Sequence, residues 1–436
     1  MLLSFLLQVT GPAGWLRDKL PASIPDLVVY DVIWPLIQIA IALFVVMTLI
    51  AYLTLAERKI SAWIQIRMGP MRVGPWGLLQ PAADGLKLLI KEDIVPILAD
   101  KAVFTIAPII SMVVAVAVLV VIPYGGGWAP ITDVNIALLF ILAVSSVGTL
   151  GIILGGWASN SKYPLLGALR SSAQMISYEV AMGLALIGPL MFSKTLSLVG
   201  IINAQNFDHI WYVFYQPLGF IVYFVSALAE TNRAPFDLPE AESELTGGFH
   251  TEYSGFRFSL YFIAEYAAMF TVSAVAVTIF LGGGDFGGAI GHFLRPNHEN
   301  LYVLISILVF FGKVLAVLWA FMWFRWTFPR YRYDQLMDVG WKWLIPAALA
   351  NIVISGVLFV VELNFGFLVS DGNNIYAPTW AFRGFVVIAN ALITLLITAV
   401  LLSSINKRSR DFNLRTQRQL QIQRKQDRIA GAEAGD

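Results

Sequence analysis

Six carboxylates fall within 23 residues of this chain, in a segment between two long apolar runs: Glu230, Asp237, Glu240, Glu242, Glu244 and Glu252. A carboxylate near hydrocarbon is expensive to ionise, and several close together raise one another's pKa. Such a cluster can hold and release protons, or respond to a charge that appears beside it. We therefore expect the loop 230–257 to carry the chemistry of the protein, as a group whose members titrate together.

The acidic loop also has a local pattern. Asp237 can cap a short helix, with Glu240 three residues on closing a capping box. Glu240 and Glu244 would then share one face of that helix, while Glu242 points away. The alternative is an exposed acidic face, which is how most charge runs behave. Apolar neighbours such as Phe236 and the attachment to apolar runs at both ends weigh against that alternative.

Other ionisable groups accompany the cluster. Arg233 and Arg257 can compensate only two of its six carboxylates. A single carboxylate near the end of a span is usually a structural residue paired with a neighbour. Four ionisable side chains at the edge of spans or inside them favour a path for protons or charge instead. These four are Glu179, Glu230, Glu265 and Lys313.

The elements that position these residues are predicted to be transmembrane helices. The chain has 436 residues, of which 58% are hydrophobic and 13% are charged, a composition typical of integral membrane proteins. Nine apolar runs are long enough to cross a bilayer. They lie near 33–56, 102–122, 134–157, 175–193, 210–229, 258–281, 301–323, 343–361 and 379–402. The fold class predicted is an all-α polytopic bundle of about nine transmembrane helices.

Charge predicts the orientation of the bundle. The loops after odd-numbered spans and the C-terminal tail hold 23 of the 29 Lys and Arg residues. By the positive-inside rule the N-terminus is external and the C-terminus cytoplasmic. The segment 1–32 is then an external, interfacial piece, 33–405 is the membrane domain with cytoplasmic loops 57–101 and 230–257, and 406–436 is a basic polar cytoplasmic tail.

The residue types exclude some redox chemistry for this chain. It has no cysteine, so it supplies no thiolates to an iron–sulfur cluster. All four histidines fall in predicted loops, which excludes a haem held by two histidines between helices. If the protein takes part in electron transfer, another protein chain carries the electrons.

The first cytoplasmic loop is too apolar to be a plain linker. Gly-Pro breaks at Gly69 and Gly74 precede an amphipathic helix predicted over 78–93, with Asp84, Lys87 and Lys91 at helical spacing. We favour a folded surface for a partner or ligand, with simple anchoring at the membrane interface as the alternative.

Four segments carry a resemblance to a known family: Ala56–Asp93, Arg170–Glu179, Ala229–Tyr266 and Arg325–Leu336. Over nearly its whole length the chain resembles the H subunit (subunit 1) of proton-pumping NADH:quinone oxidoreductase, respiratory complex I. The resemblance implies that the chain forms much of the quinone chamber and couples quinone reduction to proton translocation.

The resemblance also implies roles for particular residues. Arg58, Arg67, Asp84 and Lys87 inherit places in the quinone chamber or at its entrance. A proton-coupling group comprises Glu179, Glu230, Arg233, Asp237, Glu240, Glu242, Glu244, Glu252 and Glu265.

The cofactors and partners implied by the resemblance lie mostly outside this chain. It binds no cofactor itself, ubiquinone or another quinone is the substrate, and FMN and iron–sulfur clusters belong to partner subunits. Those partners are the quinone-module subunits of the peripheral arm and the antiporter-like membrane subunits. Membrane lipid is a further partner, and nucleic acid is not. The chain is longer than compact mitochondrial versions, which favours a bacterial inner membrane over a mitochondrial one.

Two other function classes stay open from the sequence. A stand-alone cation/proton antiporter also needs acids inside the membrane, but would not need the elaborate first loop and often shows an inverted repeat. A membrane anchor of an energy-converting hydrogenase shares the same ancestry. Co-purification with an NADH-oxidising arm, with a nickel–iron hydrogenase or alone would separate the three.

Overall fold

A computed structural model describes residues 33–125, 133–237, 247–286, 299–364, 368–371, 375–378, 384–400 and 403. Seven helices in these ranges are long and apolar enough to cross a membrane, and two shorter apolar helices, Pro217–Glu230 and Gly384–Val400, accompany them. Eight of the nine predicted spans thus overlap one helix each, the span predicted over 210–229 is divided between two helices, and the all-α membrane fold is confirmed. Neither terminus lies within the described residues, so the orientation of the bundle remains a prediction.

The main helices of the bundle in chain order are α4 (Trp34–Ile64), α6 (Lys101–Val118), α7 (Ala137–Ala158), α8 (Lys162–Ser193), the shorter α11 (Pro217–Glu230), α13 (Gly255–Phe280), α15 (Glu299–Thr327) and α17 (Ile345–Asn364). Between them lie η2 (Pro75–Gly77), α5 (Gln80–Ile90), η3 (Leu119–Val121), α9 (Leu198–Asp208), α10 (Tyr212–Tyr215), η4 (Gly248–His250), α16 (Tyr333–Val339) and the π-helical turn η5 (Gly340–Leu344). Two short antiparallel strands, β1 (Leu368–Asp371) and β2 (Ile375–Pro378), form a small ribbon.

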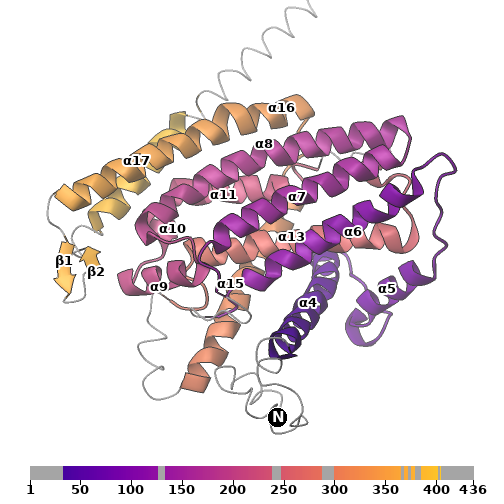
Figure 1. Cartoon of the computed structure of the whole chain (residues 1–436), viewed down its shortest axis with the longest axis horizontal. Helices are drawn as coiled ribbons and strands as arrows, with labels where there is room; N and C mark the ends of the chain where they lie inside the picture. The colour runs from indigo at the N-terminus through magenta and orange to yellow at the C-terminus, as the bar shows by residue number, and fades with distance from the viewer. Residues whose placement is uncertain are drawn as a thin grey trace, which may run out of the picture.

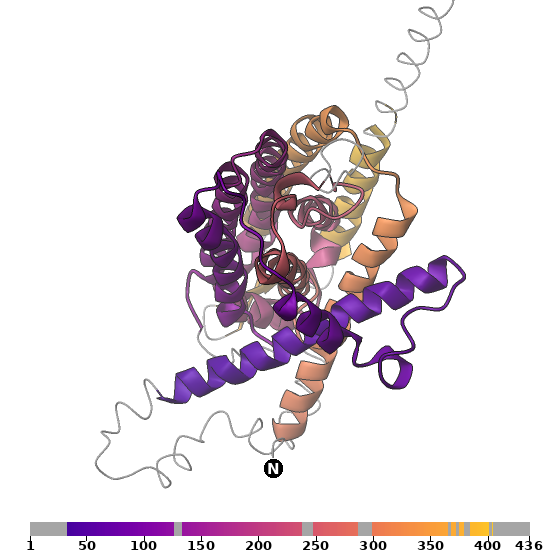
Figure 2. The same ribbon diagram turned by 90° about the vertical axis from the view of Figure 1, so that its right-hand side faces the viewer.

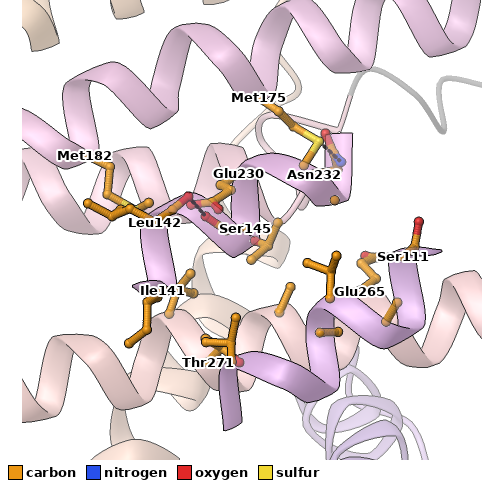
Figure 3. A pocket seen from close by; sticks show the side chains of 18 of the residues that line it. Ser111, Ile141, Leu142, Ser145, Met175, Met182, Glu230, Asn232, Glu265 and Thr271 are labelled. Atoms are coloured by element: carbon orange, nitrogen blue, oxygen red, sulfur yellow. Dashed lines mark hydrogen bonds between the residues drawn. The ribbon is translucent and has the colours of Figure 1, made fainter. Parts of the chain in front are cut away.

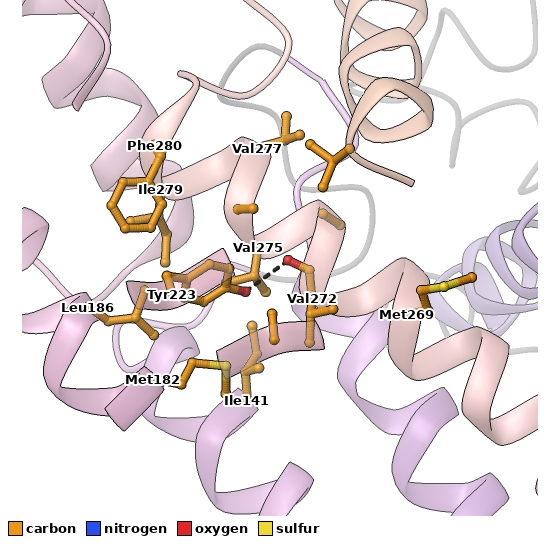
Figure 4. Packing of buried hydrophobic residues seen from close by; sticks show 14 of the residues in the cluster. Ile141, Met182, Leu186, Tyr223, Met269, Val272, Val275, Val277, Ile279 and Phe280 are labelled. Atoms are coloured by element: carbon orange, nitrogen blue, oxygen red, sulfur yellow. Dashed lines mark hydrogen bonds between the residues drawn. The ribbon is translucent and has the colours of Figure 1, made fainter. Parts of the chain in front are cut away.

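Helix α13 is the centre of the bundle. In its most apolar window 78% of the residues are buried, whereas the other long spans bury 22% to 44%. Every residue from 269 to 280 is buried. Figure 4 shows one side of this core, where the Tyr223 hydroxyl donates to the Val272 carbonyl at 2.8 Å among apolar side chains. Because the hydroxyl has a partner, the ring can be buried without the cost of an unpaired polar atom.

Small residues let the helices approach closely. Gly156 of α7 lies so near α8 that a Cβ atom there would come within 2.3 Å of the Ala168 Cβ. A Cβ at Gly155 would come within 2.3 Å of the Tyr261 hydroxyl on α13. Close backbone approach is the usual source of packing energy between helices in a membrane. These two glycines therefore fix α7 against both of its neighbours.

Helices α4 and α15 slant across the outside of the bundle formed by α6, α7, α8, α11 and α13 (Figures 1 and 2). Helix α5 projects to one side of the bundle next to α4, as Figure 1 shows, and it confirms the amphipathic helix predicted over 78–93. The span predicted over 210–229 is divided instead. It consists of α10 and α11, because Pro217 opens a new helix where its missing N–H costs nothing.

Candidate functional site

Glu57 is the centre of a buried ionic cluster at the end of the bundle that carries α5. It accepts hydrogen bonds from Arg233 Nη1 at 3.0 Å and from the Tyr266 hydroxyl at 2.6 Å. Arg325 Nη1 makes a further ion pair with Glu57 Oε1. A buried carboxylate is tolerated only when it is paired and hydrogen-bonded in this way. Three elements, α4, α13 and α15, and the turn after α11 therefore meet at one side chain.

Arg233 links Glu57 to a second carboxylate. Its Nε lies 2.7 Å from Glu265 Oε1, and its guanidinium lies over the ring of Tyr266, 4.3 Å from the centroid. Burial alone would lower the pKa of Arg233, but Glu265 and Glu57 together raise it. Arg233 therefore stays charged between the two carboxylates, and with Arg325 the cluster balances two positive charges against two negative ones.

Three cavities follow one another from α5 into the bundle. The entrance cavity, of about 430 Å³, lies between α4, α5 and α13. The Arg233 cavity, of about 260 Å³, contains the ionic cluster, and the two share Arg58, Phe262 and Tyr266 in their walls. The Glu230 cavity, of about 130 Å³, lies among α6, α7, α8, α11 and α13. Glu265 lines both the Arg233 cavity and the Glu230 cavity.

The Glu230 cavity is apolar except for a few groups. Glu230 at the end of α11 and Glu265 on α13 reach it from separate helices (Figure 3). The Oε2 atom of Glu230 is buried, with no hydrogen-bond partner among the described residues. His250 also lines the cavity, and its burial lowers its pKa to about 4. In the described part of the chain no group of three His, Asp or Glu side chains could hold a metal ion.

A known family shares the sequence that builds this geometry. The model of the NADH dehydrogenase family matches residues 37–356, which include all three cavities and the ionic cluster.

The chain belongs to the NADH dehydrogenase family.

Similar proteins of known name indicate which member of the family this chain most resembles. The chain is 48% identical over 334 residues to H subunit 1 of the NADH-quinone oxidoreductase of Cytophaga hutchinsonii, covering 74% of this chain and 96% of that protein. It is 48% identical over 346 residues to the corresponding H subunit 1 of Geobacter metallireducens, covering 77% and 99%. That of Koribacter versatilis is 44% identical over 393 residues, covering 75% and 92%.

The resemblance seen in the sequence is thus confirmed. The chain is an H subunit, a multi-pass membrane component of the H⁺-translocating NADH:quinone oxidoreductase, in the bacterial inner membrane.

The structure brings together six of the residues predicted for this NADH dehydrogenase chain. Arg58, Asp84 and Lys87 line the entrance cavity, where Arg58 Nη1 lies 2.6 Å from Asp84 Oδ2. Glu230, Arg233 and Glu265 line the two inner cavities. Glu179 lines none of the three, but its carboxylate accepts hydrogen bonds from Ser145 and Ser146, and Ser145 faces the Glu230 cavity.

Other predicted residues lie apart from the cavities. Asp237 pairs with Arg330 at 3.0 Å, and Arg67 is exposed, donating to Gln65. Glu252 is partly exposed and lines none of the three cavities formed by the described residues. Glu240, Glu242 and Glu244 lie outside the described residues, and so does the capping box predicted for Asp237.

Two sequence interpretations differ from the structure. Arg257 was expected to compensate the acidic loop, but its Nε pairs with Asp93 of the first loop at 3.2 Å. Lys313 was grouped with the membrane carboxylates. Its ammonium lies at the opposite end of α13, where it donates to the carbonyls of Leu281, Gly283 and Asp285 at 2.6 to 2.9 Å. There it satisfies the carbonyl of the residue that caps α13, Leu281, and two carbonyls of the turn that follows, a position to which a cation is suited.

Sequence reasoning missed Glu57, Tyr266 and Arg325. Glu57 follows an apolar run and precedes Arg58 and Lys59, so it reads as a loop charge. Helix α4 continues to Ile64, however, and places Glu57 on the face that buries Ile50 and Leu53. The helical spacing of these three residues is the signal that could have revealed it.

Proposed function

We propose that this membrane chain forms much of the membrane part of the quinone chamber and couples quinone reduction to proton translocation. The observation that carries the proposal is the series of three cavities, with Glu265 in the wall of two of them. Reducing a quinone to a quinol consumes two electrons and two protons. The two electrons reach the quinone from an iron–sulfur cluster in one partner subunit, and that cluster receives them from FMN in another. This chain contributes the cavity, the charged side chains and the protonatable groups.

The entrance cavity suits a quinone by its chemistry. Met47, Ile50 and Phe258 give it apolar walls that can hold an isoprenoid tail. Arg58, Asp84 and Lys87 give one side polar groups that can orient the headgroup. The cavity lies between a transmembrane helix and the amphipathic α5, where a lipid-soluble substrate can enter from the bilayer. Arg67, exposed on the same loop, belongs to the approach rather than to the cavity.

The inner cavities suit a response to charge. A negative charge formed on the quinone side attracts Arg233 and Arg325, which now balance Glu57 and Glu265. A shift of either guanidinium changes how readily Glu265 takes a proton, because the interaction of buried charges is strong. Glu265 faces Glu230 across the next cavity, and Ser145 leads on to Glu179. Asp237, Glu240, Glu242, Glu244 and Glu252 are proposed as further members because they share one loop with Arg233.

The first loop is proposed as the surface for the peripheral arm. Ile66 and Ile97 are each 95% exposed, and Trp63, Met68 and Trp76 are exposed as well. So many large apolar side chains on one exposed loop indicate an interface with another protein. Antiporter-like membrane subunits, to which coupling must lead, are the second proposed set of partners.

Two glycines test the quinone site with a matched pair of variants. Gly85 of α5 lines the entrance cavity, and Gly183 of α8 lines none of the three. Both are helical, and a Cβ at either would meet nothing within 4 Å. Gly85→Leu should therefore narrow the cavity and raise the KM for a long-tailed quinone several-fold, while Gly183→Leu leaves it unchanged. NADH:ferricyanide activity, which bypasses the quinone, reports assembly. If the two variants had the same KM for quinone, the result would show that quinone does not bind in this cavity.

A further inference from the structure

The turn between Glu230 and Asp237 sends three charged side chains in three directions. Glu230 faces its cavity, Arg233 reaches Glu57 and Glu265, and Asp237 pairs with Arg330. Backbone bonds within the turn are few, and they include Asn232 N to Ala229 O at 3.2 Å and Phe236 N to Arg233 O at 2.8 Å. Something outside the turn must hold its two ends at a fixed separation if the three side chains are to keep their targets.

Gln174 of α8 makes that connection. Its side chain is completely buried, and Nε2 donates to the carbonyls of Ala229 at 2.8 Å and Phe236 at 2.7 Å. Both protons of one amide group are therefore used, one at each end of the turn. The Ala229 carbonyl belongs to the last turn of α11, where carbonyls have no partner within the helix. Gln174 is thus a second donor to the Ala229 carbonyl, beside Asn232 N, and it ties this end of the helix to the Phe236 end of the turn.

The neighbours of Gln174 on the same face of α8 support the same turn. Ser171 donates to Asn232 Oδ1 at 3.4 Å, and the ring of Tyr178 packs against Phe236 with centroids 5.5 Å apart. Residues 171, 174, 175 and 178 lie on one helix face by their spacing. Among these four residues, and within the described part of the chain, Gln174 alone forms hydrogen bonds to both ends of the turn.

We propose that Gln174 is a positioning residue for the quinone-linked proton chemistry, which acts by holding Arg233 between Glu57 and Glu265. This inference rests on the proposed function. Gln174 lines none of the three cavities, so it does not act by contact with the quinone or with a transferred proton. Its Oε1 has no partner among the described residues, so its contribution lies in its two N–H donors.

The first test replaces those donors. Gln174→Leu keeps most of the volume and removes both hydrogen bonds, and in an assembled complex it should lower NADH:quinone activity about tenfold. Gln174→Asn keeps an amide, but its side chain is one methylene too short to reach both carbonyls. The NADH:quinone activity of this variant should lie between that of Gln174→Leu and that of the native protein. Ser172→Ala is the matched control. Ser172 is also buried on α8, but within the described part of the chain its hydroxyl bonds only Leu169 of its own helix, so activity should stay within about twofold.

The second test asks whether Gln174 acts through Arg233. Arg233→Lys keeps the charge but cannot bridge two carboxylates in the same geometry. If Gln174 serves only to place Arg233, adding Gln174→Leu to Arg233→Lys should lower quinone activity no further than Arg233→Lys alone does. A general loss of structure would instead multiply the two effects, and that result would overturn the proposal. Failure of both Gln174 variants to assemble would overturn it too, because Gln174 would then be a folding residue.

The two tests distinguish a failure of the positioning role of Gln174 from a failure of the proposed coupling function. If Arg233→Lys lowers quinone activity but Gln174→Leu does not, the positioning role is wrong and the proposed function stands. If Arg233→Lys leaves quinone activity and proton translocation at the native level, the charge-coupling function itself is contradicted.

Discussion

Arg233 Nη1 lies 3.0 Å from Glu57 Oε1, although the two residues are 176 positions apart in the chain. The contact joins the end of α4 to the turn after α11, and Glu265 on α13 completes it from the other side of the guanidinium. The two loops that the sequence predicts to be functional therefore meet in one buried ionic cluster. The proposed coupling depends on this contact, because it places the acidic loop beside the cavity proposed for quinone.

Neutralising Glu57 should destabilise the protein more than its hydrogen bonds alone suggest. Glu57→Gln leaves Arg233 and Arg325 with Glu265 as the remaining carboxylate of the cluster. Leaving a buried charge without its partner typically costs about 3 kcal/mol. The thermal unfolding midpoint of the detergent-solubilised complex should fall accordingly. Asp84→Asn is the control, because Asp84 and Arg58 are 32% and 46% exposed and such a pair contributes less than about 1 kcal/mol. Equal effects of the two variants would show that Glu57 is not a buried partner.

Asp84→Ala should impair quinone use without loss of assembly. Asp84 lines the entrance cavity and holds Arg58, whose guanidinium also faces the Arg233 cavity. Removing it frees Arg58 to move into the path of the quinone, and the KM for quinone should rise several-fold. The measurement is NADH:quinone activity relative to NADH:ferricyanide activity in the same membranes. A parallel loss of both activities would point to failed assembly instead.

His250 should make the complex sensitive to acid. Burial among the rings of Phe249 and Tyr261 lowers its pKa to about 4, whereas the unfolded chain takes up this proton near pH 6.5. Between these pH values the unfolded state binds more protons than the folded state. The stability contributed by the neutral His250 is therefore fully present above pH 6.5 and is lost as the pH falls toward 4. The loss reaches about 3 kcal/mol at most. His250→Phe keeps a ring and removes the titration, so its unfolding midpoint should change less over this range. An equally steep change in the variant would assign the acid sensitivity to other groups.

The predicted orientation can be tested by labelling, because the native chain has no cysteine. Lys162 and Asn203 are both exposed, the first at the start of α8 on the side predicted to be cytoplasmic and the second on α9 at the other end of that helix. A membrane-impermeant thiol reagent should label Lys162→Cys in inside-out vesicles, and Asn203→Cys in right-side-out vesicles. The reverse labelling pattern would show that the bundle has the opposite orientation in the membrane.

The helices were predictable because length and apolarity alone require them. Eight of the nine apolar runs overlap one helix each, the run interrupted by Pro217 forms two, and the amphipathic pattern around Asp84 predicted α5. Which charges pair was not predictable, since Glu57 meets residues 176, 209 and 268 positions away and no local pattern relates them. Arg257 and Lys313 differ from expectation for the same reason. Their partners, Asp93 and three backbone carbonyls, are set by how helix ends meet in space.

The central claim is that Glu265 passes the effect of quinone reduction from the Arg233 cavity to the Glu230 cavity. The most direct measurement is NADH-driven proton translocation and quinone reduction in inside-out vesicles carrying Glu265→Gln, with exposed Glu92→Gln as control. The amide keeps the shape of the side chain and removes its charge and titration. With NADH:ferricyanide activity unchanged, both rates should fall about tenfold or more in Glu265→Gln and stay at the native level in Glu92→Gln. An assembled Glu265→Gln complex that reduced quinone and pumped protons at the native rate would contradict the account.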